Sequence, residues 1–185
     1  MKRVAKYAVF KTKWGFFGIL GTEKGLLQTC LPMTRRESVK SVLFTDKVKA
    51  EFDRRYFQAL QEMISAYFEG CYVDFNPADV PITLDGFSGF SRKIYSACRD
   101  VKFGQKISYG QLAEKAGSIK ACRAVGNCMA HNKLPLIVPC HRVVRSDGRL
   151  GGFSGSGGVK MKKKLLGHER KIAESYVACR AACNN

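Results

Sequence analysis

The stretch Ser108-Tyr109-Gly110-Gln111-Leu112-Ala113-Glu114-Lys115-Ala116-Gly117 decides how the second half of this chain folds. Ser108 can cap a short helix, whose apolar positions share one face: Leu112, Ala113 and Ala116. Gly117 and Ser118 then make a turn, and residues 119–131 predict a second helix. Two helices joined by a tight glycine turn form the helix-turn-helix pattern, which is typical of DNA-binding proteins.

The predicted second helix is unusual for a reader of DNA sequence. Its centre runs Ala121-Cys122-Arg123-Ala124-Val125-Gly126-Asn127-Cys128-Met129-Ala130, mostly small side chains with one long cation. Recognition helices in the major groove carry several Arg, Lys, Asn or Gln side chains, whereas small residues allow a close approach to a groove. The composition favours binding with little sequence preference, in the minor groove. The alternative is a helix buried in its domain, and we expect Val125 and Met129 to be buried in either case.

Further along, a cysteine and a histidine are adjacent in Pro139-Cys140-His141-Arg142-Val143. The apolar residues 136–138 before them predict a short strand. A thiol is a strong nucleophile only as its thiolate, and at an unperturbed pKa near 8.5 only about 3% of it is ionised at neutral pH. A neighbouring imidazole or cation raises that fraction. Here His141 adjoins the sulfur and three arginines follow: Arg142, Arg145 and Arg149. Cys140 is therefore a candidate nucleophile.

The first half predicts a mixed α/β domain. Residues 4–10, 15–21 and 25–30 are short β-branched or aromatic runs separated by turn residues, which indicates an antiparallel meander. Residues 56–68 place apolar side chains at helical spacing, and Gly70 supplies a stop. We expect this helix to pack its apolar face on the sheet.

The chain divides near residue 86. Residues 71–88 contain two prolines and several turn residues and are interpreted as a connector, and residues 91–101 predict a helix. The expected organisation is an N-terminal α/β domain (1–86), a second domain that carries the helix-turn-helix and the cysteine (87–170), and a C-terminal tail (171–185).

The charge of the chain indicates a polyanionic partner. Its net charge is +17, of which residues 1–85 carry about +3 and residues 86–185 about +14. A field of that sign suits nucleic acid, although a basic surface can also serve solubility alone.

Composition also argues against several other classes of protein. The start, Met1-Lys2-Arg3, is followed by Lys6 before any apolar core, so no signal peptide is expected. No apolar run is long enough to span a bilayer. The eight cysteines are expected to be free thiols, and the first half offers too few ligands for a zinc site. We expect a bacterial or archaeal cytoplasmic protein, or a nuclear one if it is eukaryotic.

Several motifs, in this order, carry a resemblance to a known family: Ser108–Ala113, Arg123-Ala124-Val125-Gly126, Asn132, Pro139-Cys140-His141-Arg142-Val143-Val144, Gly151-Gly152-Phe153-Ser154-Gly155, Lys162, and Leu165-Leu166-Gly167-His168-Glu169. Together they resemble the O6-alkylguanine-DNA alkyltransferases, also called methylated-DNA–protein-cysteine methyltransferases, over roughly residues 87–170. The resemblance implies a ribonuclease-H-like α/β first domain and a mostly α, winged helix-turn-helix second domain.

The activity that the resemblance implies is direct repair of O6-alkylguanine in DNA, and less efficiently of O4-alkylthymine. The damaged base is flipped into a pocket, and Cys140 takes the alkyl group irreversibly, so each molecule reacts once. No cofactor and no metal are implied. The partner is double-stranded DNA with little sequence preference; no membrane association is expected, and the protein is expected to be a monomer.

The resemblance also assigns catalytic roles to residues. His141 would act as a base toward Cys140 through a water molecule, and Glu169 would hold and polarise the imidazole. Asn132 would hold the backbone of the reactive segment. The Tyr109 hydroxyl and the backbone amide of Ser154 would donate to the guanine as it leaves.

Base and DNA contacts are assigned in the same way. The carbonyls of Cys140 and Val143 would accept from the guanine amino group, and the residues expected around the base are Val143, Phe153, Ser154, Gly155 and Met129. Arg123 would replace the flipped base in the stack, with further DNA contacts from Ala121, Ala124, Gly126, Asn127 and Tyr109.

For several of these residues, a purely structural role remains an alternative interpretation. Tyr109 could be a core tyrosine, Arg123 a phosphate contact, and Asn132 a helix cap. Glu169 could be a surface acid paired to Arg170 or Lys171, and the lysines at 160 and 162–164 could form a solvated basic face. The alternative functions are a non-catalytic alkylguanine-binding protein on the same scaffold, which lacks a reactive cysteine, and a sequence-reading winged-helix regulator.

Overall fold

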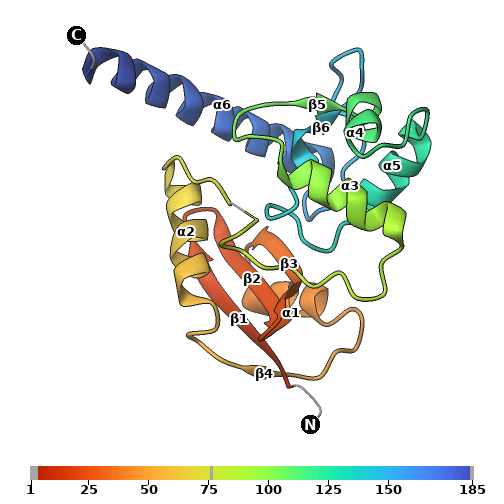
Figure 1. Cartoon of the computed structure of the whole chain (residues 1–185). Coiled ribbons are helices and arrows are strands. Elements are labelled where there is room, and N and C mark those ends of the chain that lie inside the picture. Colours follow the sequence, from red (N-terminus) through yellow and green to blue (C-terminus); the bar gives the residue numbers. More distant parts are fainter. Residues whose placement is uncertain (1–3, 76, 184–185) are drawn as a thin grey trace.

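The structure is a computed structural model that describes residues 4–75 and 77–183. The first half holds a four-stranded sheet of order β3-β2-β1-β4 (Figure 1). The predicted meander is confirmed as β1 (Ala5–Thr12), β2 (Gly15–Thr22) and β3 (Gly25–Met33), which pair antiparallel. A fourth strand that was not predicted, β4 (Ala50–Phe52), pairs parallel with β1 and makes the sheet mixed. The residues at the start, Met1–Arg3, and the end of the predicted tail, 184–185, lie outside the described residues.

One helix covers each face of this sheet. Helix α2 (Gln58–Glu69) buries Leu60, Ile64, Tyr67 and Phe68 in the main core, as the spacing of residues 56–68 predicts. It ends at Gly70, whose φ of 107° is accessible to glycine, so the predicted stop is confirmed. Helix α1 (Arg36–Leu43) covers the other face with Val39 and Leu43. Helix α1 was not predicted from the sequence, because only two of its residues are buried.

The helix-turn-helix prediction is confirmed in the second half. After α3 (Gly89–Arg99), helix α4 (Tyr109–Lys115) begins with a capping box, in which the Ser108 hydroxyl accepts from the Gln111 amide. Gly117, with φ of 71°, turns the chain toward α5 (Cys122–Ala130), which starts three residues later than predicted. Two short strands, β5 (Ile107–Ser108) and β6 (Val143–Val144), pair parallel beside these helices.

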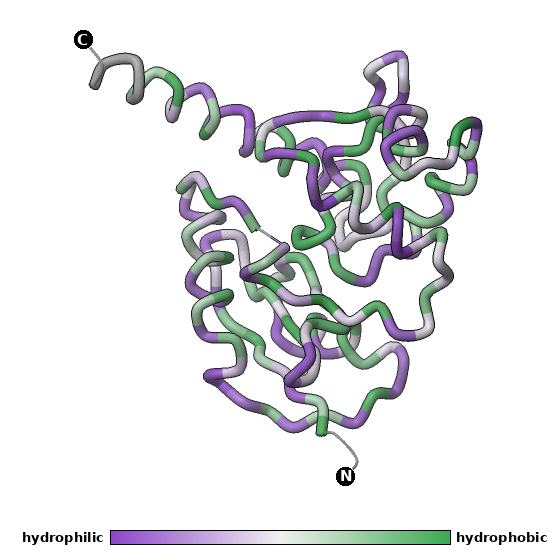
Figure 2. The backbone as a smooth tube through the Cα atoms, viewed as in Figure 1, coloured by the Kyte–Doolittle hydropathy of each residue, from purple (hydrophilic) through white to green (hydrophobic). Residues whose placement is uncertain are grey.

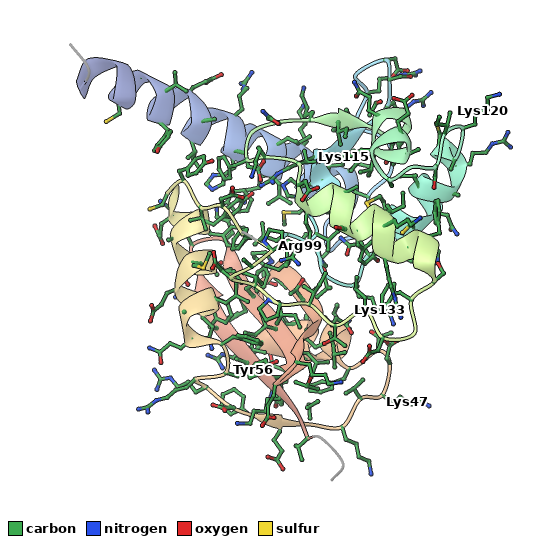
Figure 3. The ribbon with its side chains drawn as sticks, in the orientation of Figure 1. Lys47, Tyr56, Arg99, Lys115, Lys120 and Lys133 are labelled. Atoms are coloured by element: carbon green, nitrogen blue, oxygen red, sulfur yellow. The ribbon has the colours of Figure 1, made fainter. Side chains whose placement is uncertain are left out.

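The prediction of a strand at residues 136–138 is wrong. Leu136 has φ of 79°, which a regular strand does not allow, and the Val138 amide donates back to the Leu134 carbonyl at 2.8 Å. The segment is instead a buried turn held by the first half, because the Thr29 hydroxyl donates to the Pro135 carbonyl at 2.8 Å. Lys133, labelled in Figure 3, adds an ion pair to Asp46 at the same junction.

The residues predicted to form a C-terminal tail are, as far as residue 183, part of the last helix. Helix α6 (Gly158–Cys183) runs without a break through residue 170 and extends away from the body of the molecule (Figure 1). Ile172, beyond the predicted boundary, still packs in the main core. The polar composition of residues 171–183 suggested a tail, but alanine, arginine and glutamate are good helix formers.

The two halves share one hydrophobic core. The main cluster of buried residues runs from Ala8 in β1 to Ile172 in α6, and Figure 2 shows hydrophobic segments in both halves where they meet. Arg99, labelled in Figure 3, adds a hydrogen bond of 2.6 Å from its guanidinium to the Val80 carbonyl of the connector. The sheet and its helices therefore pack directly against the second half.

Candidate active site

The reactive segment is a single turn of 3₁₀ helix, η1 (Cys140–Arg142), which directly precedes β6. The Cys140 amide donates to the Val138 carbonyl at 2.7 Å, and the Arg142 amide donates to the Pro139 carbonyl at 2.8 Å. This tight turn gives the adjacent Cys140 and His141 side chains different partners. A straight strand could not do so without turning one side chain to the opposite face of the sheet.

Asn132 holds the Cys140 sulfur. Its side-chain amide donates to Cys140 Sγ at 3.1 Å and to the Val138 carbonyl at 2.9 Å, and its own Oδ1 accepts from the Leu134 amide. Asn132 thus fixes both the thiol and the turn in front of it. The C-cap of α5 is His131, so the alternative of a capping role for Asn132 is not what the structure shows.

Burial, rather than the neighbouring arginines, dominates the pKa of Cys140. Only 5% of the residue is exposed, and this burial raises the pKa of the thiol, while the Asn132 hydrogen bond and the Lys162 charge pull it down. The expectation that the three flanking arginines raise the thiolate fraction is wrong. Arg142 pairs with Glu169, and Arg145 and Arg149 are exposed side chains that pair with Asp147.

Lys162 is the cation that acts on Cys140, and the prediction that it belongs to a solvated basic face is wrong. It is fully buried on the inner face of α6, and its ammonium donates to the Val143 carbonyl at 2.6 Å and to the Gly152 carbonyl at 3.3 Å. Burial lowers the pKa of Lys162, against the pull of the thiol groups of Cys140 and Cys98. The neighbours at 163 and 164 are exposed, as predicted.

Glu169 is the centre of a buried charge network and not a surface acid. Its carboxylate accepts from His141 Nε2 at 2.8 Å, from the guanidinium of Arg142 at 3.0 Å, from the Tyr67 hydroxyl at 3.0 Å and from the Gly104 amide at 3.2 Å. Burial alone would raise the pKa of Glu169, but His141 and Arg142 together hold it well below its usual range. The carboxylate is therefore ionised at neutral pH.

The network fixes the protonation of His141. Burial lowers the pKa of this imidazole, against the pull of Glu169, so the ring is neutral at pH 7. A carboxylate only accepts hydrogen bonds, so Nε2 carries the proton and Nδ1 carries a lone pair. Nδ1 is buried and has no partner among the described residues. An unpaired basic nitrogen in such a position is suited to take a proton.

A pocket of about 550 Å³ opens onto Cys140. Six of the predicted site residues line it: Tyr109, Gly126, Met129, Cys140, Phe153 and Ser154. Ala130, Gly151 and Gly152 also line it and were not predicted, although Gly151 and Gly152 stand in the glycine-rich motif before Phe153. Arg145 lines it too, and was expected near Cys140 only as a charge that raises the thiolate fraction.

Other predicted residues lie behind the pocket wall. Val143 is fully buried, and its carbonyl accepts from Lys162, so its expected contact with a base stays a prediction. Gly155 also lies outside the lining. A methyl group on Gly155 would come within 2.6 Å of the Phe153 ring and 3.0 Å of Leu31 in β3. The first half of the chain therefore packs against the loop that carries Phe153.

Helix α5 connects this pocket to an exposed basic surface. Val125 and Met129 are buried, as predicted, while Arg123, Ala124 and Asn127 are exposed and Ala121 and Gly126 are half-buried. Lys120, labelled in Figure 3, projects into the solvent from the turn before α5. Small side chains on the outside and a pocket on the inside allow this helix to lie against a duplex while a base enters the protein.

Within residues 4–75 and 77–183, no three His, Cys, Asp or Glu side chains cluster in a way that could hold a metal ion. No helix in the same described range is long and apolar enough to cross a membrane. A thiol that lines a pocket, an unpaired imidazole nitrogen on the next residue and a buried cation that lowers the pKa of the thiol are the parts needed for attack by a thiolate.

The chain is similar to proteins of known activity. Residues 89–171 match the family described as 6-O-methylguanine DNA methyltransferase, DNA binding domain. The methylated-DNA–protein-cysteine methyltransferase of Mycolicibacterium paratuberculosis is 38% identical over 117 residues, which are 63% of this chain and 67% of that protein. The rat protein of the same name is 51% identical over 81 residues, but these span only 38% of its length.

Solved structures extend the similarity to both halves. The crystal structure of the O6-methylguanine methyltransferase of Mycobacterium tuberculosis superposes with a TM-score of 0.72 at 28% identity, covering 91% of this chain and 94% of that one. The same bacterium's protein in complex with DNA gives a TM-score of 0.74 at 29% identity, covering 90% and 94%.

Proposed function

The chain belongs to the O6-methylguanine DNA methyltransferase family and repairs O6-methylguanine in DNA directly, and we propose that Cys140 is the residue that accepts the alkyl group. One observation carries this assignment: Cys140 lies at a pocket of about 550 Å³, where an amide donates to its sulfur and a buried ammonium group lowers its pKa. Cys30 and Cys98 are also buried, but neither lines this pocket.

The thiolate forms by proton transfer toward His141. The Nδ1 lone pair takes the proton from Cys140 through a water molecule, and Glu169 stabilises the imidazolium that results. Lys162 and Asn132 stabilise the charge left on the sulfur, since both favour the ionised form of Cys140. Burial keeps the Cys140 thiol protonated until His141 accepts its proton and Lys162 and Asn132 stabilise the thiolate.

The transfer step is a displacement at the alkyl carbon. The sulfur forms a bond to that carbon as the bond to O6 breaks, and the electron pair passes to the guanine ring. Tyr109, which lines the pocket beside Cys140, and the Ser154 backbone amide donate hydrogen bonds to the leaving base. The product is a thioether, which thiol exchange cannot reverse, so each molecule reacts once. The same pocket takes O4-alkylthymine less efficiently.

DNA binds through α4 and α5. The duplex lies on the exposed face of α5 with little sequence preference, the damaged base enters beside Gly126 and Met129, and Arg123 fills the gap in the stack. Flipping costs a few kcal/mol for unstacking, which the inserted guanidinium reduces. The protein acts as a monomer.

Mass spectrometry tests the assignment of Cys140. After incubation with a duplex that contains O6-methylguanine, the peptide containing Cys140 should gain about 14 Da, the mass of one methylene. Cys140→Ser should bind the duplex and stay unmodified, whereas Cys128→Ser, on the neighbouring α5, should react as the unchanged protein does. A methyl group on another cysteine would show that this other cysteine is the nucleophile. An unmodified protein that still binds the lesion would favour the non-catalytic alternative.

A further inference from the structure

Strand β1 has an open edge beyond the short strand β4. The parallel pairing ends at Tyr7 and Phe52, and the Asp53 amide then donates to the Tyr7 carbonyl at 3.0 Å. Figure 1 shows β4 beside only the beginning of β1. Because alternate residues of a strand direct their backbone groups to the same edge, the amides and carbonyls of Val9 and Lys11 face outward there. Among the described residues, neither forms a backbone hydrogen bond beyond the sheet.

A groove of about 1010 Å³ runs along this open edge. Its walls come from β1, the start of α1, β4 and α2, so it is bounded on both faces of the sheet. It is separate from the pocket at Cys140, with which it shares no residue.

The groove is basic and partly apolar. Lys11, Arg36, Arg54 and Arg55 line it, against the single acid Glu62. None of these four cations forms an ion pair in the part of the chain that the structure describes. Phe52, also in the lining, is 54% exposed. A single lysine on an open edge protects a sheet from aggregation, but three additional unpaired arginines and an exposed aromatic ring are not needed for that.

We propose that this groove docks an extended acidic segment of a partner protein, which adds to the sheet as a strand beside β1. The open edge offers donors and acceptors in alternation, and a peptide backbone satisfies both. A nucleic acid phosphate accepts hydrogen bonds but cannot donate to the carbonyls of Val9 and Lys11. Side chains of an added strand alternate between the two faces of the sheet. Carboxylates on one face then meet Arg36, and those on the other meet Arg54 and Arg55.

A fluorescein-labelled peptide that alternates glutamate with valine is a direct probe, measured by fluorescence anisotropy with the full chain. It should bind, and the double variant Arg54→Glu with Arg55→Glu should weaken binding by about tenfold. Lys24→Glu, a charge reversal in the exposed turn between β2 and β3, is the matched control and should change binding by less than about twofold. All variants should transfer the benzyl group of O6-benzylguanine to Cys140 at the unchanged rate.

Two further measurements separate strand addition from simple charge attraction. A peptide N-methylated at alternate residues keeps its charge but loses the backbone donors, so it should bind about tenfold more weakly. Lys11→Pro removes an amide that faces the open edge and leaves the ladder to β2 intact, so it should weaken binding more than Lys11→Gln, which loses the same charge but keeps the amide. In NMR spectra, the amides of Val9 and Lys11 should shift on addition of the probe.

The proposal fails if the acidic peptide does not bind, if Lys24→Glu weakens binding as much as the arginine reversals, or if the N-methylated peptide binds equally well. It also fails if an undamaged DNA duplex displaces the probe from the groove, since the surface would then be part of the nucleic-acid interface.

Discussion

The reactive turn and helix α5 serve one reaction but are built in opposite ways. Around the turn, His141, Arg142, Lys162 and Glu169 are almost fully buried, and each forms short hydrogen bonds to protein groups. On α5, Arg123 and Asn127 are exposed and most other side chains are small. The turn depends on buried charges, which are costly when a partner is lost. The helix depends on solvent-exposed charge and shape, where single substitutions cost less.

Glu169→Gln should have the largest effect on stability. It leaves the buried guanidinium of Arg142 without its counter-charge, and removing one member of a buried pair costs about 3–5 kcal/mol. Urea unfolding should show this loss, and alkyl transfer at pH 7 should fall as well. The matched control is Glu174→Gln on the same helix, whose exposed pair with Arg170 has a separation of 3.8 Å and should cost less than about 1 kcal/mol. If the two variants lost equal unfolding free energy, the buried network would be no more sensitive to substitution than the exposed pair.

The difference in unfolding free energy between the unchanged protein and Glu169→Gln should depend on pH, because the pKa of Glu169 is lowered in the folded state. A carboxyl whose pKa is lower in the folded state stabilises the protein above its unfolded pKa of about 4.3, and the contribution is lost as the pH falls below it. The stability gap between the unchanged protein and Glu169→Gln should therefore be constant near neutrality and shrink in acid. A gap that grew in acid would contradict an ionised Glu169.

Lys162→Met should have the next largest effect. It should change the rate of alkyl transfer to Cys140 more than the stability of the fold. It keeps the length of the side chain but removes the charge that opposes the raised pKa of Cys140. One unit of pKa corresponds to about tenfold in thiolate at neutral pH, so benzyl transfer from O6-benzylguanine should slow by about that factor and recover in alkaline solution. Lys163→Met, at the exposed neighbour, should leave the profile unchanged. The same loss at every pH would make the role of Lys162 structural rather than electrostatic.

The sequence predicts the parts of both regions that depend on local pattern. The capping box of Ser108 and Gln111, the glycine stop of α2 and the buried stripe of α5 are all set by residues within one or two turns of each other. Alternation and turn residues likewise predict β1, β2 and β3. These elements are confirmed because nothing distant overrides the local preference.

Tertiary contacts decide the parts that the sequence analysis got wrong. Residues 136–138 have the composition of a strand, but Thr29, more than 100 positions away, holds them as a turn. Lys162 stands among exposed lysines and differs from them only because one face of α6 lies against Val143. Tyr67 gave no signal beyond an apolar helix face, yet its hydroxyl reaches Glu169. A single sequence carries no mark of such distant partners.

Arg123→Ala tests the exposed region and should have a moderate effect. If the guanidinium replaces a flipped base, the variant should repair O6-methylguanine in duplex DNA about tenfold more slowly, because more of the unstacking cost is left uncompensated. Its reaction with free O6-benzylguanine should be unchanged. Arg123→Lys keeps the charge but loses the planar group, so it should also be slow on duplex. Full activity of Arg123→Lys would support a phosphate contact instead.

Tyr67→Phe should have the smallest effect and sharpens the contrast within the buried region itself. Glu169 keeps Arg142, His141 and the Gly104 amide when the Tyr67 hydroxyl is removed, so the loss should be about 1 kcal/mol, the net worth of one hydrogen bond. Because Tyr67 belongs to α2, this bond ties the first half of the chain to the catalytic network. In a double-mutant cycle with Glu169→Gln, the two losses should not add, since residues in one network are coupled. Additive losses would mean that the hydroxyl contributes to packing alone, and that the first half supports the site only through the shared core.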